Sequence, residues 1–273
     1  MSTQVASRTR SGSAGAATNT GSLSFPRAVR GEWIKLSTLR STWWSIGITA
    51  LLTIGIAALI AQSVSIPEFD AIQAVVLPVQ FTMLLAGILG AISVTGEYST
   101  GMIRSTLTAN PVRGSVLAAK AVVLALFLFV SSLLIFFGAA LAVGLIVGAR
   151  GQSIDWSDPT HSLLPIVFAS ASMAVFALIG VAFGFLLRSG AGAIAATVGL
   201  LFVLPIVANF FSFAGESWQW VTELANRLPS VAAQNAILPA SGSGVDGEAW
   251  LTLVAWVVAT TLAAWAVLRT RDA

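Results

Sequence analysis

Six long runs of apolar residues dominate the sequence and leave few folds open to it. Each run is close to the ~20 residues that an α-helix needs to cross the hydrocarbon core of a bilayer. Only 9% of the residues are charged, whereas a soluble domain carries roughly 25%. We therefore expect an all-α integral membrane protein with six transmembrane helices, at residues 43–62, 71–94, 120–148, 161–187, 191–213 and 249–268.

The distribution of basic residues predicts the orientation of these spans, because cytoplasmic loops carry an excess of Lys and Arg. With the N-terminus inside, the outer loops hold only Arg150 and Arg227. Both termini are therefore expected in the cytoplasm. No ionisable residue lies in the middle of a predicted span, which argues against an ion-driven pump. The basic residues expected inside are Arg8, Arg10, Arg27, Arg30, Lys35, Arg40, Arg104, Arg113, Lys120, Arg188, Arg269 and Arg271.

Two segments precede the first span. Residues 1–25 are rich in Ser, Thr, Gly and Ala, so we expect a disordered cytoplasmic tail. Residues 26–42 place Val29, Trp33, Leu36 and the stem of Arg40 on one helical stripe, with Lys35 among the polar positions around it. This pattern predicts an amphipathic helix that lies on an anionic membrane surface. We expect this helix to anchor the chain to the membrane. A second predicted role is to act as a lever on the first span.

A long polar segment, residues 95–119, joins the second and third spans where a few residues would suffice. Ser99 or Thr100 is expected to cap a short helix that has Ile103 and Leu107 on one face. Glu97 precedes this helix, where the positive end of the helix dipole favours a carboxylate.

The same segment also predicts how the third span begins. Asn110 followed by Pro111 is a start signal for its helix. Two interpretations of the segment remain open on the residues alone. It is either a solvated connector, with Arg104, Arg113 and Lys120 as ordinary positive-inside anchors, or an ordered element that docks a cytoplasmic partner.

Small residues and prolines predict how the spans pack. Gly180 and Gly184 form a GxxxG pair in the fourth span, and Gly144/Gly148 and Ala86/Gly90 are similar pairs in the third and second. Such pairs let helices approach closely, either within the bundle or at a dimer interface. Pro78 and Pro205 should kink the spans that contain them. Only residues 188–190 separate the fourth span from the fifth, so we expect these two spans to form a tight helical hairpin.

Three stretches carry a resemblance to a known family: RGEWIKLSTLRSTWW, GEYSTGMIRSTLTANPVRGSVLAAK and RLPSVAAQNAIL. The chain resembles the permease subunit of ATP-binding-cassette (ABC) transporters of the type-2 exporter family, particularly the short half-permeases of actinobacteria. The resemblance implies that residues 95–119 contain a coupling helix that sits in a cleft of a separate ATPase subunit. The positions that it assigns to this contact are Glu97, Gly101, Arg104, Leu107, Pro111 and Arg113.

The resemblance also implies the setting of such a subunit. It would lie in a bacterial plasma membrane, pair with a second copy or a similar chain, and leave ATP and Mg²⁺ to the partner ATPase. Residues 214–248 would form short extracellular helices, acting as an outer gate or as a lid on the membrane. Export of a lipid, a peptide or a hydrophobic antibiotic would suit an uncharged path.

Motifs of other functions are missing from the sequence. It contains no GxxxxGK[ST] loop for ATP, no Gly-x-Ser-x-Gly or HExxH motif, and no cysteine. Its one histidine, His161, is expected to cap or border a span, so we predict no catalytic group, cofactor or metal, and no nucleic-acid partner. A membrane scaffold or sensor that recruits a cytoplasmic partner is the main alternative. An intramembrane hydrolase is a weaker one, because paired catalytic groups are lacking.

Overall fold

The structure, a computed structural model, describes residues 24–63, 70–109, 112–211, 213, 216–238 and 245–270. This part of the chain is almost wholly helical and contains no strand. Residues 1–23, most of the expected tail, lie outside it. Six helical segments within it are long and apolar enough to cross a membrane: α2 (Arg40–Ser63), α3–α4 (Ala71–Val76 and Val79–Ser99), α6 (Arg113–Gly148), α7 (Leu163–Leu187), α8–α9 (Gly190–Val198 and Leu204–Phe211) and α12 (Gly247–Thr270).

The expected all-α, six-span architecture is therefore confirmed, and the boundaries of most spans move by only a few residues. The largest change is at the third span, which begins at Arg113 rather than at residue 120. With 36 residues, α6 is about 54 Å long at ~1.5 Å per residue. It is thus much longer than the ~30 Å that the hydrocarbon core requires.

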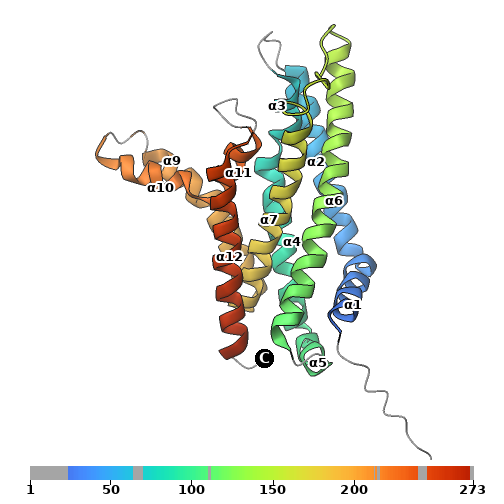
Figure 1. Ribbon diagram of the computed structural model, residues 1–273, viewed down its shortest axis with the longest axis vertical. Coiled ribbons are helices and arrows are strands. Elements are labelled where there is room, and N and C mark those ends of the chain that lie inside the picture. The colour runs from blue at the N-terminus through green and yellow to red at the C-terminus, as the bar shows by residue number, and fades with distance from the viewer. Residues whose placement is uncertain are drawn as a thin grey trace, which may run out of the picture.

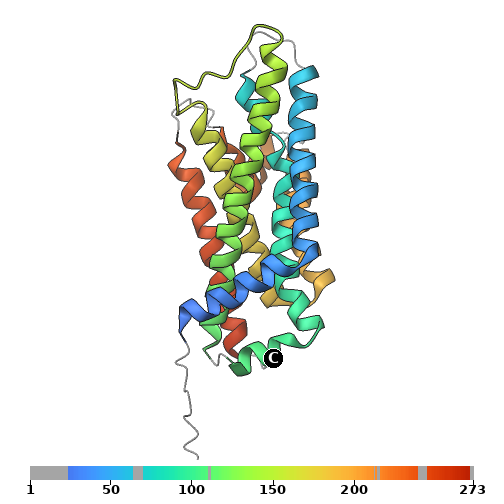
Figure 2. The ribbon, with the colours of Figure 1, turned by 90° about the vertical axis from the view of Figure 1, so that its right-hand side faces the viewer.

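The long helices run side by side along one axis (Figure 1). Helix α1 (Phe25–Thr38) instead crosses the bundle near one end, and the short helix α5 (Met102–Ala109) lies at the same end (Figure 2). We call this the α5 end. The opposite end carries α3, and we call it the α3 end. Helix α11 (Pro229–Ile237) lies beside the start of α12, on the α3 side of the bundle (Figure 1).

Helices α4 and α7 form the centre of the bundle because glycines let their backbones touch. A Cβ added to Gly180 would lie 1.9 Å from the carbonyl oxygen of Gly87, and one added to Gly90 would lie 2.2 Å from that of Ala177. A Cβ on Gly184 would likewise lie 2.7 Å from the Cβ of Val94. Gly180 and Gly184 thus lie where α4 and α7 approach each other most closely inside the bundle.

The glycine pair of the third span behaves differently. A Cβ added to Gly144 or Gly148 would meet nothing within 4 Å in the described part of the chain. This pair therefore takes no part in the packing of the bundle. Whether it contributes to a dimer interface stays a prediction.

Both prolines that were predicted to kink a span lie at interruptions of the regular α-helix. Pro78 separates α3 from α4, so the second span consists of two helices. Pro205 lies in the first turn of α9, directly after a π-helical turn at Gly199–Val203. Proline has no N–H to donate to the carbonyl four residues earlier, and wide π-turns are one way in which a helix accommodates that loss.

A tight hairpin joins α7 to α8, as residues 188–190 predict. Arg188 ends α7 in the left-handed region with φ 53°, a conformation that costs a non-glycine residue roughly 1–2 kcal/mol. Its guanidinium lies 5.4 Å from the ring centroid of Tyr98, in a cation–π contact with the end of α4. Ser189 then caps α8 by accepting a hydrogen bond from the backbone N–H of Gly192.

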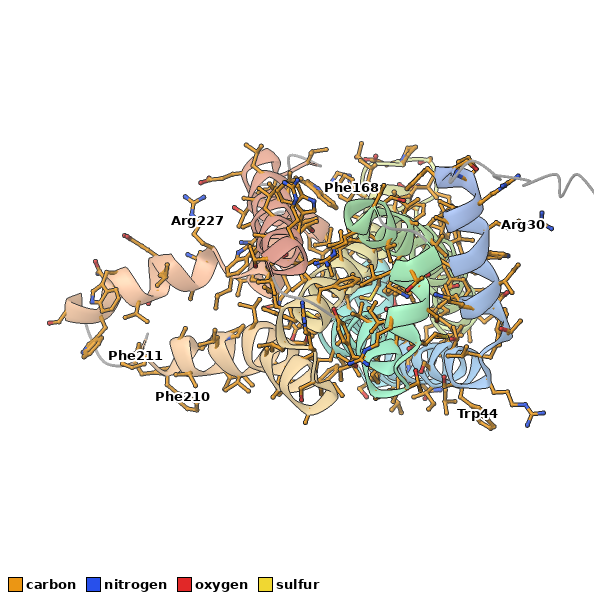
Figure 3. The ribbon with its side chains drawn as sticks, turned by 90° about the horizontal axis from the view of Figure 1, so that it is seen from below. Arg30, Trp44, Phe168, Phe210, Phe211 and Arg227 are labelled. Atoms are coloured by element: carbon orange, nitrogen blue, oxygen red, sulfur yellow. The ribbon has the colours of Figure 1, made fainter. Side chains whose placement is uncertain are left out.

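The end of the fifth span leaves the bundle and forms an arm with the next short helix. Helix α10 (Gln219–Asn226) follows α9 after a 3-10 turn at Glu216–Trp218, and no residue of α9 or α10 is buried. Seen from below, the arm with Phe210 and Phe211 extends away from the side of the bundle that carries Arg30 and Trp44 (Figure 3). Helices α10 and α11 are two short helices in the segment before the last span, and their expected extracellular location stays a prediction.

Candidate functional site: a buried charge network at the α5 end

Four charged side chains from three helices meet at the α5 end. Glu32 and Lys35 come from α1, Glu97 from the last turn of α4, and Lys120 from the second turn of α6. Lys120 Nζ lies 2.6 Å from Glu32 Oε2 and 2.8 Å from Glu97 Oε1. Lys35 Nζ lies 2.8 Å from Glu32 Oε1 and 2.9 Å from Glu97 Oε1. We call these four residues the charge network.

Most of this network is buried. The side chains of Glu32, Glu97 and Lys120 are 8%, 4% and 6% exposed, whereas that of Lys35 is 31% exposed and forms the rim. Burial alone would raise the pKa of Glu32, but the attraction and hydrogen bonds of Lys120 and Lys35 outweigh it and hold the pKa below its usual value. Burial alone would lower the pKa of Lys35, but its hydrogen bonds to Glu32 and Glu97 raise the pKa above its usual value.

The two lysines connect the network to neighbouring elements. Besides its two carboxylates, Lys120 donates to the carbonyl oxygen of Ser93 at 3.2 Å, and Lys35 donates to Thr106 Oγ1 of α5 at 3.4 Å. Each ammonium therefore uses all three of its donors. A compact ammonium fits between two carboxylates and a third acceptor better than the planar fork of an arginine does. The network thus links α1, α4 and α6 with α5.

Helix α5 packs one face on the bundle and leaves the other exposed, as predicted. Ile103 is buried and Leu107 is half-buried against the core, whereas Arg104 is exposed. Gly101 has φ 71°, a left-handed conformation that ends α4 and turns the chain into α5. The predicted cap of α5 is wrong, because the hydroxyls of Ser99 and Thr100 bond back to the carbonyl of Gly96.

Three charged residues of the network lie where the sequence did not predict them. Glu97 does not precede α5 near its positive end, because α4 continues to Ser99 and directs this carboxylate toward the two ammonium groups. Lys120 is not a solvated anchor, since α6 starts seven residues earlier and Lys120 is buried. Glu32, which sequence analysis did not single out, is the buried residue of α1. Partners of opposite charge offset the cost of burying these groups.

Arg113 lies outside the network but joins two other elements at the α5 end. Its Nη1 donates to the carbonyl oxygen of Leu268 at 2.7 Å, so the start of α6 is bound to the last turns of α12. This cation near the C-terminus of α12 also suits the helix dipole. Pro111 and Asn110, the predicted start of the third span, lie outside the described residues, and α6 begins at Arg113.

The predicted residues of the interfacial helix divide between two elements. Trp33 belongs to α1 and is half exposed, and its ring makes an edge contact with Phe127 of α6 at 6.1 Å between centroids. Arg40 is not part of that helix. The chain is extended at Leu39, so Arg40 is the first residue of α2 and is exposed.

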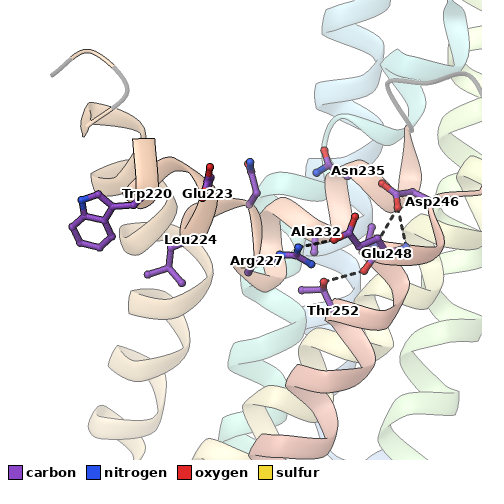
Figure 4. A pocket seen from close by; sticks show the side chains of 11 residues that line it. Trp220, Glu223, Leu224, Arg227, Ala232, Asn235, Asp246, Glu248 and Thr252 are labelled. Atoms are coloured by element: carbon purple, nitrogen blue, oxygen red, sulfur yellow. Dashed lines mark hydrogen bonds and ion pairs between the residues drawn. The ribbon is translucent and has the colours of Figure 1, made fainter. Parts of the chain in front are cut away.

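A second charged region lines a cleft of about 700 Å³ between α10, α11 and α12 (Figure 4). Arg227 Nη2 lies 2.6 Å from Glu248 Oε1, and both side chains are more than half exposed. Asp246 caps α12 by accepting from the backbone N–H groups of Glu248 and Ala249, each at 3.0 Å. This pair joins only two elements, and water reaches both of its members.

His161 takes part in an exposed turn before α7. Its Nδ1 lies 2.8 Å from Asp158 Oδ2. Hydrogen bonds from Thr160 and His161 lower the pKa of Asp158 to about 2. The described residues contain no group of three or more His, Cys, Asp and Glu side chains that could hold a metal ion.

Sequence analysis missed Glu32 and Thr106 as members of this site and treated Lys120 as a surface anchor. One signal could have found them. Lys35 and Lys120 are the two lysines of a chain with fourteen basic residues, and both lie in the network. The Glu32/Lys35 spacing of three residues also places an acid and a base on one face of a helix.

The fold and this site define a polytopic α-helical membrane protein with an ordered polar end. A family model described as ABC-2 family transporter protein matches residues 28–214, well over half of the chain. The chain therefore belongs to the ABC-2 transporter family, whose members are the membrane permease components of ABC transporters. All four residues of the charge network lie within the matched region. No curated protein matches the chain.

Proposed function

We propose that this chain is a permease subunit that exports a hydrophobic or amphipathic substrate, such as a lipid, a peptide or an antibiotic. The energy would come from ATP hydrolysed by a separate cytoplasmic ABC ATPase subunit, and α5 would be the coupling helix that binds it. The observation that carries the proposal is that α5 has one face packed on the bundle and one face exposed. Ile103 and Leu107 hold its inner face on the bundle, while Arg104, Ser105 and Thr108 are exposed on the other, and Gly101 just before the helix is exposed as well.

The charge network gives this helix a mechanical connection to the spans. Thr106 of α5 accepts from Lys35, and Lys35 is paired with Glu32 and Glu97. Pulling the network apart would leave a buried charge without its partner, which costs roughly 3–5 kcal/mol. A push on α5 is therefore expected to move α1 and the adjoining ends of α4 and α6 together, rather than to be absorbed at their contacts.

The α5 end is proposed to face the cytoplasm of a bacterial cell, with both chain termini on that side. The basic residues of α1, α5 and the adjacent helix ends support this orientation. At the other end of the long helices, the loop after α6 carries Arg150, which donates to the carbonyl groups of Ala61 and Gln62.

A second permease copy, or a similar chain, is part of the proposal. The arm formed by α9 and α10 extends from the bundle with Phe210 and Trp220 largely exposed. A dimer would enclose a pathway between two bundles, and we propose that the arm, which projects from the bundle (Figure 3), contacts the second copy. Disulfide trapping through Phe210→Cys in membranes tests this part, because the sequence contains no other cysteine.

Co-purification tests the proposal as a whole. The tagged chain is extracted from its native membrane in mild detergent, as the wild type and as Arg104→Glu, which reverses a charge on the exposed face of α5. Glu223→Arg, a charge reversal of the same size and opposite sign on exposed α10, is the matched control. An ATPase subunit that the wild type and the control retain and Arg104→Glu loses supports the permease. A chain that purifies alone contradicts it, and a partner without ATPase activity favours the scaffold or sensor.

A further inference from the structure

A cavity of about 360 Å³ adjoins the charge network, between the α1–α2 elbow, α4 and α6. Its volume is within the ~300–1,000 Å³ range of small-molecule sites in proteins. Leu36, Leu89 and Leu124 line its interior, and the more exposed Leu39 and Ile92 lie at its mouth. The polar part of the lining consists of the network and four hydroxyl-bearing residues, Ser41, Thr42, Ser93 and Thr100. The cavity therefore has an apolar wall and one charged end, which is the form that an amphiphile requires.

The hydrogen bonds of the network leave one acceptor open. Lys35 and Lys120 each donate to three oxygens, and both oxygens of Glu32 accept. Glu97 Oε1 accepts from both lysines, whereas Glu97 Oε2 is buried and has no hydrogen-bond partner. A buried carboxylate oxygen of this kind is costly unless something donates to it. A hydrogen-bond donor that reached this oxygen from the cavity would remove that cost.

The charges of the network limit which chemical groups can donate to Glu97 Oε2. The two carboxylates match the two ammonium groups, so a second buried cation would leave the site with an uncompensated charge. An anion would face Glu97 Oε2 and would find both lysines with their donors already used. A neutral hydroxyl satisfies the open acceptor and adds no charge.

We propose that this cavity binds a neutral amphiphile with a hydroxyl-bearing head. The hydroxyl donates to Glu97 Oε2, and the apolar chain lies against Leu36, Leu89 and Leu124 and leaves the cavity past Ile92. The site goes beyond the proposed export function and does not depend on it, because binding is measured on the permease chain without ATP or an ATPase.

Photo-crosslinking with matched probes tests this site. The full chain is placed in phosphatidylcholine nanodiscs, whose head group has no N–H or O–H donor. The probe is a long-chain alcohol with a diazirine in its chain, and the controls are its methyl ether and the corresponding carboxylate. The alcohol is expected to label peptides of α4, α6 and the α1–α2 elbow about tenfold more than the ether, the size expected when one hydrogen bond to a charged group is lost. The carboxylate should label them no better than the ether.

Three variants locate the binding. Ile92→Trp fills the mouth from its exposed side and should abolish the labelling, whereas Leu134→Trp, on an exposed face of α6, should leave it unchanged. In Glu97→Gln the lysines hold the amide oxygen at the Oε1 position, so the amide N–H₂ replaces Oε2. Since alcohol and ether both accept from this N–H₂, the preference for the alcohol should fall to about one. Each variant is first shown to unfold cooperatively.

Equal labelling by alcohol and ether in the wild type would overturn the proposal, because a water molecule would then satisfy Glu97 Oε2. Labelling that survives Ile92→Trp would overturn it as well, since the probe would then bind elsewhere. Mass spectrometry of the chain extracted from its native membrane identifies the natural occupant. A hydroxylated glycerolipid indicates the bilayer as the source, a hydroxylated molecule of another class indicates a compound in transit, and a fatty acid contradicts the site.

Discussion

The two charged regions of this molecule are built from the same kinds of side chain but differ in what they can do. At the α5 end, Glu32, Lys35, Glu97 and Lys120 are mostly buried and join three helices. In the cleft on the α3 side, Arg227 and Glu248 are 59% and 70% exposed and join two. When a partner is lost in the cleft, water replaces it, whereas in the network a buried charge is left alone. We therefore expect burial, and not the presence of an ion pair, to decide where motion is transmitted.

The same difference applies to the elements that each region connects. Helix α10 has no buried residue, and beside the exposed ion pair it is joined to α12 by the indole of Trp256, which donates to the carbonyl of Arg227 at 2.7 Å. Helix α1 is bound to the bundle by a buried network and packs across α6. We therefore expect the arm to move easily and the α5 end to move as a unit.

The largest effect is expected from Lys120→Met, which removes the most buried cation of the network. Glu32 and Glu97 would lose two hydrogen bonds from the same ammonium, and the cost should be about 3–5 kcal/mol of unfolding free energy. Thermal unfolding of the purified chain, followed by tryptophan fluorescence, measures it. Lys35→Met is the matched control and should cost less, because Lys35 is partly exposed. Equal and small losses would show that the network contributes little.

The glycine contact of α4 with α7 should give the next largest effect. In Gly180→Ala the new Cβ would meet the carbonyl of Gly87, and the helices must separate at a cost of about 1–3 kcal/mol. Gly144→Ala on α6 is the control, since its Cβ meets nothing and a helical glycine-to-alanine change stabilises by roughly 0.5–1 kcal/mol. Both are measured in the same unfolding assay. If both variants changed the unfolding free energy equally, the backbones of α4 and α7 would not be in tight contact.

The contact of α1 with the bundle should be constant over a wide pH range. Because the folded pKa of Glu32 is lowered, its contribution is complete above the usual value of 4.5 and is lost as the pH falls through the folded value. Because the folded pKa of Lys35 is raised, its contribution is complete below 10.5 and is lost as the pH rises through the folded value. The mobility of a spin label at Arg30→Cys should stay unchanged between these limits. A transition near pH 7 would contradict the assignment.

The smallest effect is expected from Glu248→Ala in the cleft. An exposed ion pair contributes roughly 0–1 kcal/mol, so the melting temperature should hardly change. The label on α1 should report no difference at all. If Glu248→Ala lowered the unfolding free energy as much as Lys120→Met does, the two regions would not differ in the way described.

The sequence predicted the spans because a bilayer leaves a polypeptide so few choices. A run of apolar residues must satisfy its backbone internally, so the six runs had to be helices. Pro78 and the Gly180/Gly184 pair were also predictable, because their effects follow from a missing N–H and a missing Cβ. These are properties of single residues or of near neighbours along the chain.

The charge network was not predictable in this way. Lys120 and Glu32 are 88 positions apart, and only the packing of α1 across α6 brings them together. The position of Glu97 depends on where α4 ends, and the left-handed Gly101 decides that rather than the hydroxyls of Ser99 and Thr100. Amphipathicity predicted that α1 would form. It did not reveal that a charged residue, Glu32, would be the one buried.

One distance tests most directly whether the network makes α1 and α5 a single unit. Spin labels are placed at exposed Arg30→Cys and Ser105→Cys, and pulsed electron resonance measures their separation in the complex with the ATPase, with and without ATP. We predict one narrow distribution that does not change with nucleotide, a broader one in Lys35→Met, which removes the hydrogen bond to Thr106 of α5, and no broadening in Glu248→Ala. A separation that changes with ATP in the wild type, or that is the same in all three chains, would contradict the account.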